Sequence, residues 1–284
     1  MCRNHARLID VDPDAFSAAT LRLWKNKAEA SALKAIKNGE KDLADCTTLV
    51  SLSNNLIFEG FWIDAKENNT WVFSVIRFIY GNIKMLRELS TEVFGHRDVD
   101  YFICIESQGD GRLIKNSIDW NLDTNTGFYT ITVTLENKEN RIFLNDLGAD
   151  IKLDDDLDLD ITNGDFSLIS GAELAKQRIQ TIIAVNYNSV DSGYPVSFIH
   201  KYFNDHKSDK RLLERLVKLD LARLINIPFK NKIRRSCAPA LNFINRIIDV
   251  EIPSTEIVNN KIPIKLRLEW KDGNYWQDKI DLLF

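Results

Sequence analysis

The chain has 284 residues, of which 44% are hydrophobic, so it can bury one large core or two modest ones. Its 37 basic and 41 acidic side chains are spread along the whole length and leave a formal net charge of -4. This balance gives no electrostatic footprint for nucleic acid or for an anionic membrane surface, so we expect protein partners.

The N-terminal sequence and the cysteines bear on location. Polar residues follow Met1 without an apolar stretch typical of a signal peptide, and the apolar segment Trp71–Tyr80 is too short to span a bilayer. The four cysteines are far apart and form no Cys-x-x-Cys pair, which predicts reduced, structural thiols and neither zinc nor disulfides. We expect a cytoplasmic protein.

Two helices are predicted near the start of the chain. Asp12-Pro13-Asp14 favours a helix start, and apolar residues recur at near-helical spacing up to Asn38-Gly39, which predicts a helix over residues 13–38. A second helix is predicted from Thr70 to Gly95, where an apolar stripe can pack on a core. A partner-binding face is the alternative for this stripe, which consists of Trp71, Val75, Ile79, Ile83, Leu86 and Val93.

A period of two follows and predicts antiparallel strands. Strands are expected at Tyr101–Ile105, at Ile118–Leu122 and at Tyr129–Leu135, the last two joined as a hairpin. With a weak boundary at Asp146–Ile151, we predict one domain over residues 1–149, helical with a small antiparallel sheet, and a second over residues 150–284.

The second predicted domain opens with short strands and a helix. Leu157, Leu159 and Ile161 alternate with aspartates, and Thr162–Ile169 reads as a turn and another short strand. Ser170-Gly171-Ala172-Glu173 has the pattern of a capping box, so a helix should begin there.

The remaining elements are a helix over about residues 209–224, a shorter helix near residues 239–244, and two strands. Arg246–Ile252 is the first strand, a turn is expected at Asn259-Asn260, and Ile262–Trp270 is the final strand.

The order of these elements resembles the GPW/gene-twenty-five family of contractile-tail baseplate wedge proteins. The resemblance covers roughly the C-terminal half and rests on "Leu-Asp-Leu-Asp-Ile", "Gly-Asp-Phe-Ser-Leu-Ile-Ser-Gly" and "Glu-Leu-Ala-Lys-Gln-Arg-Ile". The family usually carries a Glu-Pro-Arg motif before its terminal hairpin. Here the best match is Ile244-Asn245-Arg246, in which only the arginine is retained.

The resemblance implies an α+β protein whose C-terminal wedge module has helices and a terminal β-hairpin. It further implies a structural component of a contractile phage tail baseplate wedge, assembled in the host cytoplasm, that joins wedge subunits and templates the first sheath ring. Implied partners are gene-six-like and gene-fifty-three-like wedge proteins, the tail sheath protein, and hub or tube proteins. No cofactor, nucleic acid or membrane is implied.

Three groups of residues are predicted to bind partners. Arg246 is the remnant of the family motif and is expected at a subunit junction, with an ordinary surface arginine as the alternative. Phe61 and Trp62, with Phe58, are predicted as a docking surface, with completion of the core as the alternative. The terminal strand is expected to be an exposed sheet edge that pairs with the sheath, through Ile262, Ile264, Leu266, Leu268 and Trp270.

Catalytic and metal chemistry are less well supported by the sequence. The aspartates from Asp154 to Asp165 lack the spacing of an EF-hand loop, and we interpret them as a solvated strand face. A virion-associated, lysozyme-like peptidoglycan hydrolase is the alternative function, but no carboxylate is marked as its acid and Glu173 is explained by capping. The scattered histidines predict no metal site. The basic cluster Lys230–Arg235 is a solvated surface or docks an acidic partner.

Overall fold

The computed structural model describes residues 47–66, 68–92, 98–122, 127–154, 156–162, 165–184, 196–230 and 238–283. The helix predicted over residues 13–38 lies outside these ranges. Contacts divide the chain into unit 1, Met1–Ile103 with Leu113–Asn137, and unit 2, Cys104–Arg112 with Lys138–Phe284. The chain passes from unit 1 into unit 2 for the last time after Asn137, which is earlier than the boundary expected at Asp146–Ile151.

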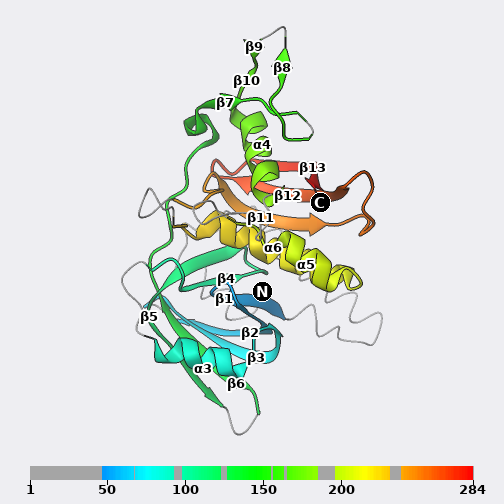
Figure 1. Ribbon diagram of the computed structural model, residues 1–284. Helices are drawn as coiled ribbons and strands as arrows, with labels where there is room; N and C mark the ends of the chain where they lie inside the picture. The colour runs from blue at the N-terminus through cyan, green and yellow to red at the C-terminus, as the bar shows by residue number, and fades with distance from the viewer. Residues whose placement is uncertain are drawn as a thin grey trace, which may run out of the picture. The chain divides into compact units, whose positions relative to one another are not determined.

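A closed six-stranded barrel with the strand order β1-β2-β3-β6-β5-β4 takes most of its residues from unit 1 (Figure 1). Its strands are β1 Thr48–Leu52, β2 Leu56–Lys66, β3 Thr70–Tyr80, β4 Phe102–Ile105, β5 Asp110–Leu122 and β6 Tyr129–Leu135. On β6, Ile131, Val133 and Leu135 are buried, while the intervening threonines are half-buried. The predicted hairpin is confirmed, with Trp120 opposite Ile131 across β5 and β6.

The helix predicted from Thr70 to Gly95 is wrong over its first half, which is β3. The segment is dense in β-branched and aromatic residues, and Trp71, Phe73 and Val75 alternate into the barrel interior. Two of these residues, Trp71 and Val75, also belong to the apolar stripe from which the helix was predicted. Of the described residues in this range, only α3, Ile83–Thr91, is helical. The carboxamide oxygen of Asn82 caps it by accepting from the Lys84 and Met85 amides.

Gly60 on β2 lies close against the backbone of β3. A Cβ atom at Gly60 would lie 2.1 Å from the carbonyl oxygen of Ser74 on β3. That atom belongs to the backbone, so it can yield only if the two strands separate.

We therefore expect Gly60→Ala to lower the free energy of unfolding by about 1–3 kcal/mol, the usual cost of overpacking. Lys115→Ala is the control, because Lys115 is exposed on β5 of the same barrel and its replacement should change stability by less than about 0.5 kcal/mol. Chemical denaturation of both variants measures the difference. Equal stabilities would show that β2 and β3 can separate at no cost.

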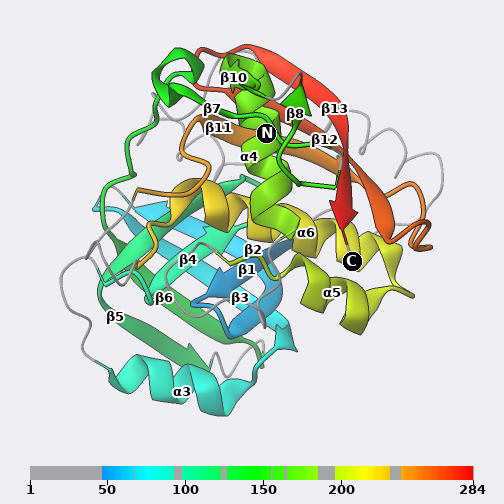
Figure 2. The ribbon, with the colours of Figure 1, turned by 45° about the horizontal axis from the view of Figure 1, so that its top comes forward.

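Unit 2 packs helices against a three-stranded antiparallel sheet with the order β11-β12-β13 (Figure 2). The sheet consists of β11 Ile244–Glu251, β12 Lys261–Trp270 and β13 Tyr275–Leu283. Helix α6, Lys210–Asn226, packs on β11 and α5, Ile199–His206, while α4, Gly171–Ala184, packs beside β13. The 3-10 helix Leu144–Leu147 and two small strand pairs precede α4. In the first pair, β7 Ala149–Ile151 is bonded to β10 Leu168–Ser170. In the second, β8 Ile161–Thr162 is bonded to β9 Asp165–Phe166.

Helix α6 and the turn before β12 confirm the predictions made for them. The Asp209 carboxylate caps α6 by accepting from the Leu212 amide, and Asn259 and Asn260 both have positive φ in the turn between β11 and β12. The shorter helix expected near residues 239–244 is instead a turn that leads into β11.

The predicted fold class is wrong. The described residues form thirteen strands and four α-helices, and the N-terminal unit is a barrel rather than a helical region with a small sheet. The C-terminal strands form a three-stranded sheet rather than a terminal hairpin, since β13 follows the strand expected to be last. None of the helices in the described ranges is both long and apolar enough to cross a bilayer.

Candidate functional site

The polar centre of unit 2 is built on the segment Cys104–Arg112, which turns at Gly109. Gly109 has a φ of +63°, and its amide donates to the Ile105 carbonyl at 2.9 Å. A Cβ at this position would lie 3.1 Å from Cγ of Arg246 and 3.2 Å from the Ile247 carbonyl oxygen. Glycine therefore lets the segment lie directly against β11 and places the next residue, Asp110, inside the unit.

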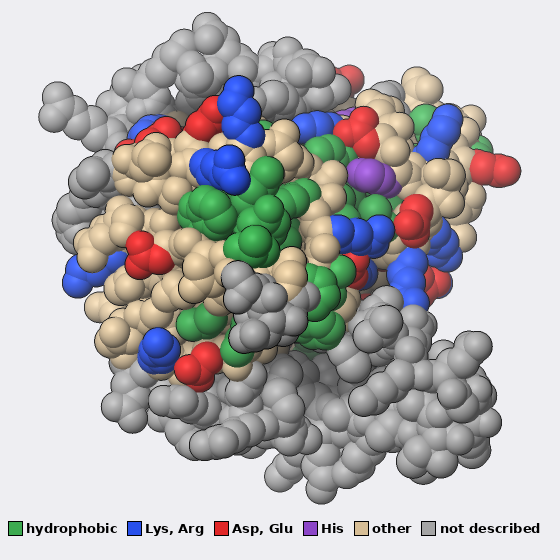
Figure 3. All heavy atoms as spheres, turned by 90° about the horizontal axis from the view of Figure 1, so that it is seen from below, with side chains coloured by type: hydrophobic (Ala, Val, Ile, Leu, Met, Phe, Trp, Pro, Cys, Tyr) green, Lys and Arg blue, Asp and Glu red, His purple; other side chains and the backbone are tan. Residues whose placement is uncertain are grey.

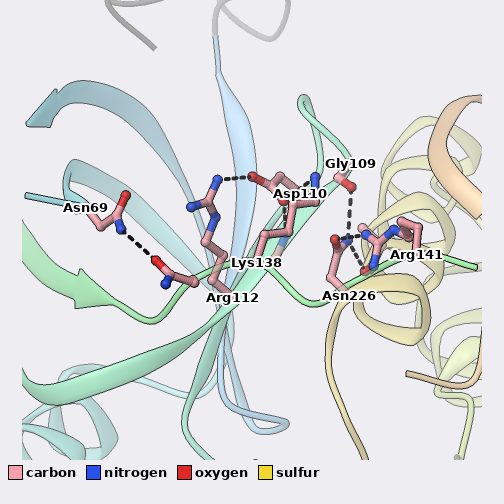
Figure 4. Close-up of polar contacts among 10 residues, drawn as sticks. Asn69, Gly109, Asp110, Arg112, Lys138, Arg141 and Asn226 are labelled. Carbon is pink, nitrogen blue, oxygen red and sulfur yellow. Dashed lines mark hydrogen bonds and ion pairs between the residues drawn. The ribbon is translucent and has the colours of Figure 1, made fainter. Parts of the chain in front are cut away.

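Asp110 lies among three cations, and we call Asp110, Arg112, Lys138 and Arg141 the Asp110 charge cluster (Figure 4). Its carboxylate is 3.4 Å from Nη2 of Arg112 and 3.2 Å from Nζ of Lys138. Burial alone would raise the pKa of Asp110, but the charges of Lys138 and Arg112 outweigh it and hold the pKa well below its ordinary value. Asp110 is therefore an ionised, buried counter-ion.

Arg141 ties this cluster to the C-terminal end of α6. Nη1 of Arg141 donates to the Ile225 carbonyl at 2.9 Å, and Nη2 donates to the carboxamide oxygen of Asn226. The side-chain amide nitrogen of Asn226, Nδ2, in turn donates to the Gly109 carbonyl at 3.1 Å (Figure 4). Burial lowers the pKa of Arg141 to about 10, while Asp110 opposes that shift. One network thus holds the turn at Gly109, the Asp110 charge cluster and α6 together.

Two further sets of buried charges hold the same segment and sheet. The Glu106 carboxylate is 3.3 Å from Nε of Arg215 and 3.6 Å from Nζ of Lys218, both on α6. Arg246 on β11 lies directly opposite Glu269 on β12, and both residues are buried. Burial lowers the pKa of Arg246, and the negative charge of Glu269 opposes this shift.

This arrangement suits holding chain segments together, because each buried carboxylate is matched to cations. A glycoside hydrolase needs a carboxyl group whose pKa is raised. Asp110 and Asp278 both have a lowered pKa, and for Asp278 the main cause is a hydrogen bond from Lys176. In the same residues, no three His, Cys, Asp or Glu side chains lie close enough to hold a metal ion.

The outer edge of β13 is the second feature of the site. β13 pairs with β12 from Tyr275 to Leu283, and no other strand of the described chain pairs with it. The Lys279 amide donates at 2.8 Å to the carboxylate of its neighbour Asp278 and not to β12, so this amide faces away from the sheet. Alternation places the main-chain groups of Gln277 and Asp281 on the same outer edge.

The aspartate-rich segment before α4 is a turn and not the strand expected from its alternation. Oδ1 of Asp154 accepts from the Asp156 and Asp158 amides, at 2.9 and 3.0 Å, and Leu157 has a φ of +66°. A carboxylate that satisfies two nearby amides stabilises a tight turn and competes with a strand ladder. Regular pairing begins only at Ile161, opposite Phe166.

The strand β12 corrects the prediction of an exposed edge. Hydrogen-bonded neighbours flank it on both sides, so it is the central strand. Its predicted partner-binding side chains are in the core of unit 2: Ile262, Ile264, Leu266, Leu268 and Trp270. Arg246 is likewise buried rather than displayed at a surface, which also rules out an ordinary surface arginine.

The predicted docking aromatics lie on β2 of the barrel. Phe58 is fully buried, while Phe61 and Trp62 are half-buried. Trp62 stacks on Phe73 with ring centroids 5.7 Å apart and contacts Trp71 at 4.9 Å, so it contributes to packing in unit 1. Apolar side chains gather on one face of the molecule (Figure 3). Among the described residues of unit 1, the exposed large hydrophobic side chains are Ile63, Ile76, Leu122 and Phe128.

Comparisons with protein-family models, curated proteins and solved structures gave no match. The sequence contained a signal for β13: Asp272-Gly273-Asn274 is a hairpin turn sequence, and Ile280 and Leu282 alternate with charged residues. The Asp110 charge cluster had no such signal, because its members come from segments whose proximity depends on the fold.

Proposed function

We propose that the chain is a structural component of a contractile phage tail baseplate wedge, which joins wedge subunits and templates the first ring of the sheath. The outer edge of β13 carries the proposal. It offers outward-facing main-chain donors and acceptors in the unit that contains residues 150–284, the part of the chain that resembles the wedge family. An added strand from a sheath subunit would satisfy these groups by main-chain hydrogen bonds.

The side chains of β13 support an edge that accepts one partner and discourages others. Lys279 and Asp281 form an ion pair of 3.3 Å along the strand, and Lys176 of α4 is paired with Asp278. Charged side chains on an edge strand reduce indiscriminate pairing between copies. Buried Ile280 and Leu282 anchor the same strand in unit 2, so the edge is rigid enough to act as a template.

The edge can be tested by Lys279→Pro, which removes one outward-facing amide. The ladder between β12 and β13 should survive, because the Lys279 amide does not take part in it. We expect tails assembled with this variant to contain baseplates but at least about tenfold less ordered sheath, since a lost main-chain hydrogen bond and an obstructed strand together exceed about 1.4 kcal/mol. Electron microscopy of the tails measures the ratio.

Lys279→Ala is the matched control, because it removes the same side chain and keeps the amide; it should give normal sheath. Circular dichroism of both purified variants checks that unit 2 is folded. Normal sheathed tails with a folded Lys279→Pro chain would refute the templating role of β13.

A further inference from the structure

The hairpin of β8 and β9 has an apolar face that the described chain leaves uncovered. Ile161 and Phe166 are directly opposite each other, so their side chains share one face. Leu159, which is bridged to Leu153, lies two residues before Ile161, and Leu168, the first residue of β10, lies two residues after Phe166. A period of two places both on that face. The exposed fractions are 53% for Leu159, 60% for Ile161, 48% for Phe166 and 70% for Leu168. Large hydrophobic side chains gathered in this way mark an interaction surface.

Carboxylates surround this face. Residues 150–168 contain seven aspartates and one lysine, a net charge of -6. Asp158 and Asp165 are exposed and alternate onto the opposite side of the strands from the apolar residues. Lys152, which is already counted in this charge, is paired with Asp160 at 2.9 Å, and Lys261 is paired with Asp156 at 2.8 Å. The two cations therefore offset only part of the charge of the seven aspartates.

We infer that the apolar face formed by Leu159, Ile161, Phe166 and Leu168 docks a basic protein segment whose apolar side chains are flanked by lysine or arginine. The apolar residues would supply the buried contact, and the aspartates would pair with the cations at its rim. The surface is separate from the edge of β13, and the inference stands whether or not the chain templates a sheath.

Charge selects this partner over the other candidates. Two copies meeting through this face would each bring a charge of -6 within the Debye length of about 8 Å at physiological salt, so self-association is opposed. Nucleic acids and anionic membranes are repelled for the same reason. A basic, partly apolar protein segment gains from both features of the face.

The test uses the full chain and two short synthetic peptides, one of alternating leucine and lysine and one of alternating leucine and glutamate. Fluorescence anisotropy measures the binding of each labelled peptide. We expect the leucine-lysine peptide to bind at least about tenfold more tightly than the leucine-glutamate peptide, with an affinity that falls as salt is added. The double variant Ile161→Ser with Phe166→Ser should weaken this binding about tenfold or more. Asp158→Asn with Asp165→Asn should weaken it several-fold and reduce its salt dependence.

Leu122→Ser is the matched control, because Leu122 is an exposed leucine of unit 1, and it should leave peptide binding unchanged. Circular dichroism of each variant checks folding. Equal binding of both peptides, or full binding by the Ile161 and Phe166 double variant, would overturn the inference. Concentration-dependent dimerisation abolished by that variant would also overturn it and identify a second copy as the occupant.

Discussion

Replacing Asp110 by asparagine is expected to lower the free energy of unfolding by about 3–5 kcal/mol, the usual cost of leaving buried charges uncompensated. Asparagine keeps the size of the side chain but removes the carboxylate that pairs with Arg112 and Lys138. These cations and Arg141 would then repel one another within unit 2. Urea denaturation followed by circular dichroism measures the loss.

Asp119→Asn is the control for this experiment. Asp119 lies on the same strand, β5, but is exposed, so its replacement should change stability by less than about 0.5 kcal/mol. Similar stabilities for the two variants would mean that the Asp110 charge cluster adds nothing to unit 2.

The effect of Asp110 should also depend on pH in a defined direction. The folded state lowers the pKa of Asp110, so its stabilising contribution is complete above the unfolded value of about 4 and is lost as the pH falls through the lower folded value. The difference in stability between the wild-type chain and Asp110→Asn should therefore be full at neutral pH and shrink in strong acid. A difference that grew on acidification would contradict the lowered pKa.

Local patterns predicted the elements whose sequence and environment agree. Helix α6 has a capping aspartate and apolar residues at helical spacing, and β6 alternates between aliphatic residues and threonine. The segment Thr70–Tyr80 was misread because it is apolar on both faces and short of charge, so its spacing fits a helix or a strand. Closure of a barrel, which requires pairing between β1 and β4, depends on contacts far apart in the chain.

In the candidate site, too, the sequence predicts local features but not those that depend on contacts far apart in the chain. Main-chain geometry such as the turn at Asn259-Asn260 can be read locally, because asparagine tolerates positive φ. Whether a strand is central or at an edge depends on what else pairs with it, and only the presence of β13 makes β12 central. For the same reason the five apolar residues predicted to bind a partner were correctly placed on one strand face and incorrectly placed at the surface.

Arg246 provides the sharpest test of that correction, since a buried arginine and an arginine at a subunit junction respond differently to substitution. Arg246→Met should lower the free energy of unfolding of the isolated chain by about 3–5 kcal/mol, because it leaves Glu269 buried without the opposing charge on the facing strand. The carboxylate would keep the hydrogen bond from the Asn245 side chain, at 3.1 Å, which cannot neutralise its charge.

The double variant Arg246→Met with Glu269→Leu should recover most of this loss, because it removes both charges and fills the space with apolar atoms. Arg267→Ala is the control: Arg267 faces Asp249 on the same two strands but is only half-buried, so its loss should cost less than about 1 kcal/mol. Thermal and urea unfolding of the wild-type chain, the single variants Arg246→Met and Glu269→Leu, and their double variant gives the coupling energy between Arg246 and Glu269. If Arg246→Met is as stable as the wild-type chain, the prediction of Arg246 at a subunit junction is supported. If Arg246→Met is unstable and the double variant recovers the stability, Arg246 stabilises the fold of unit 2.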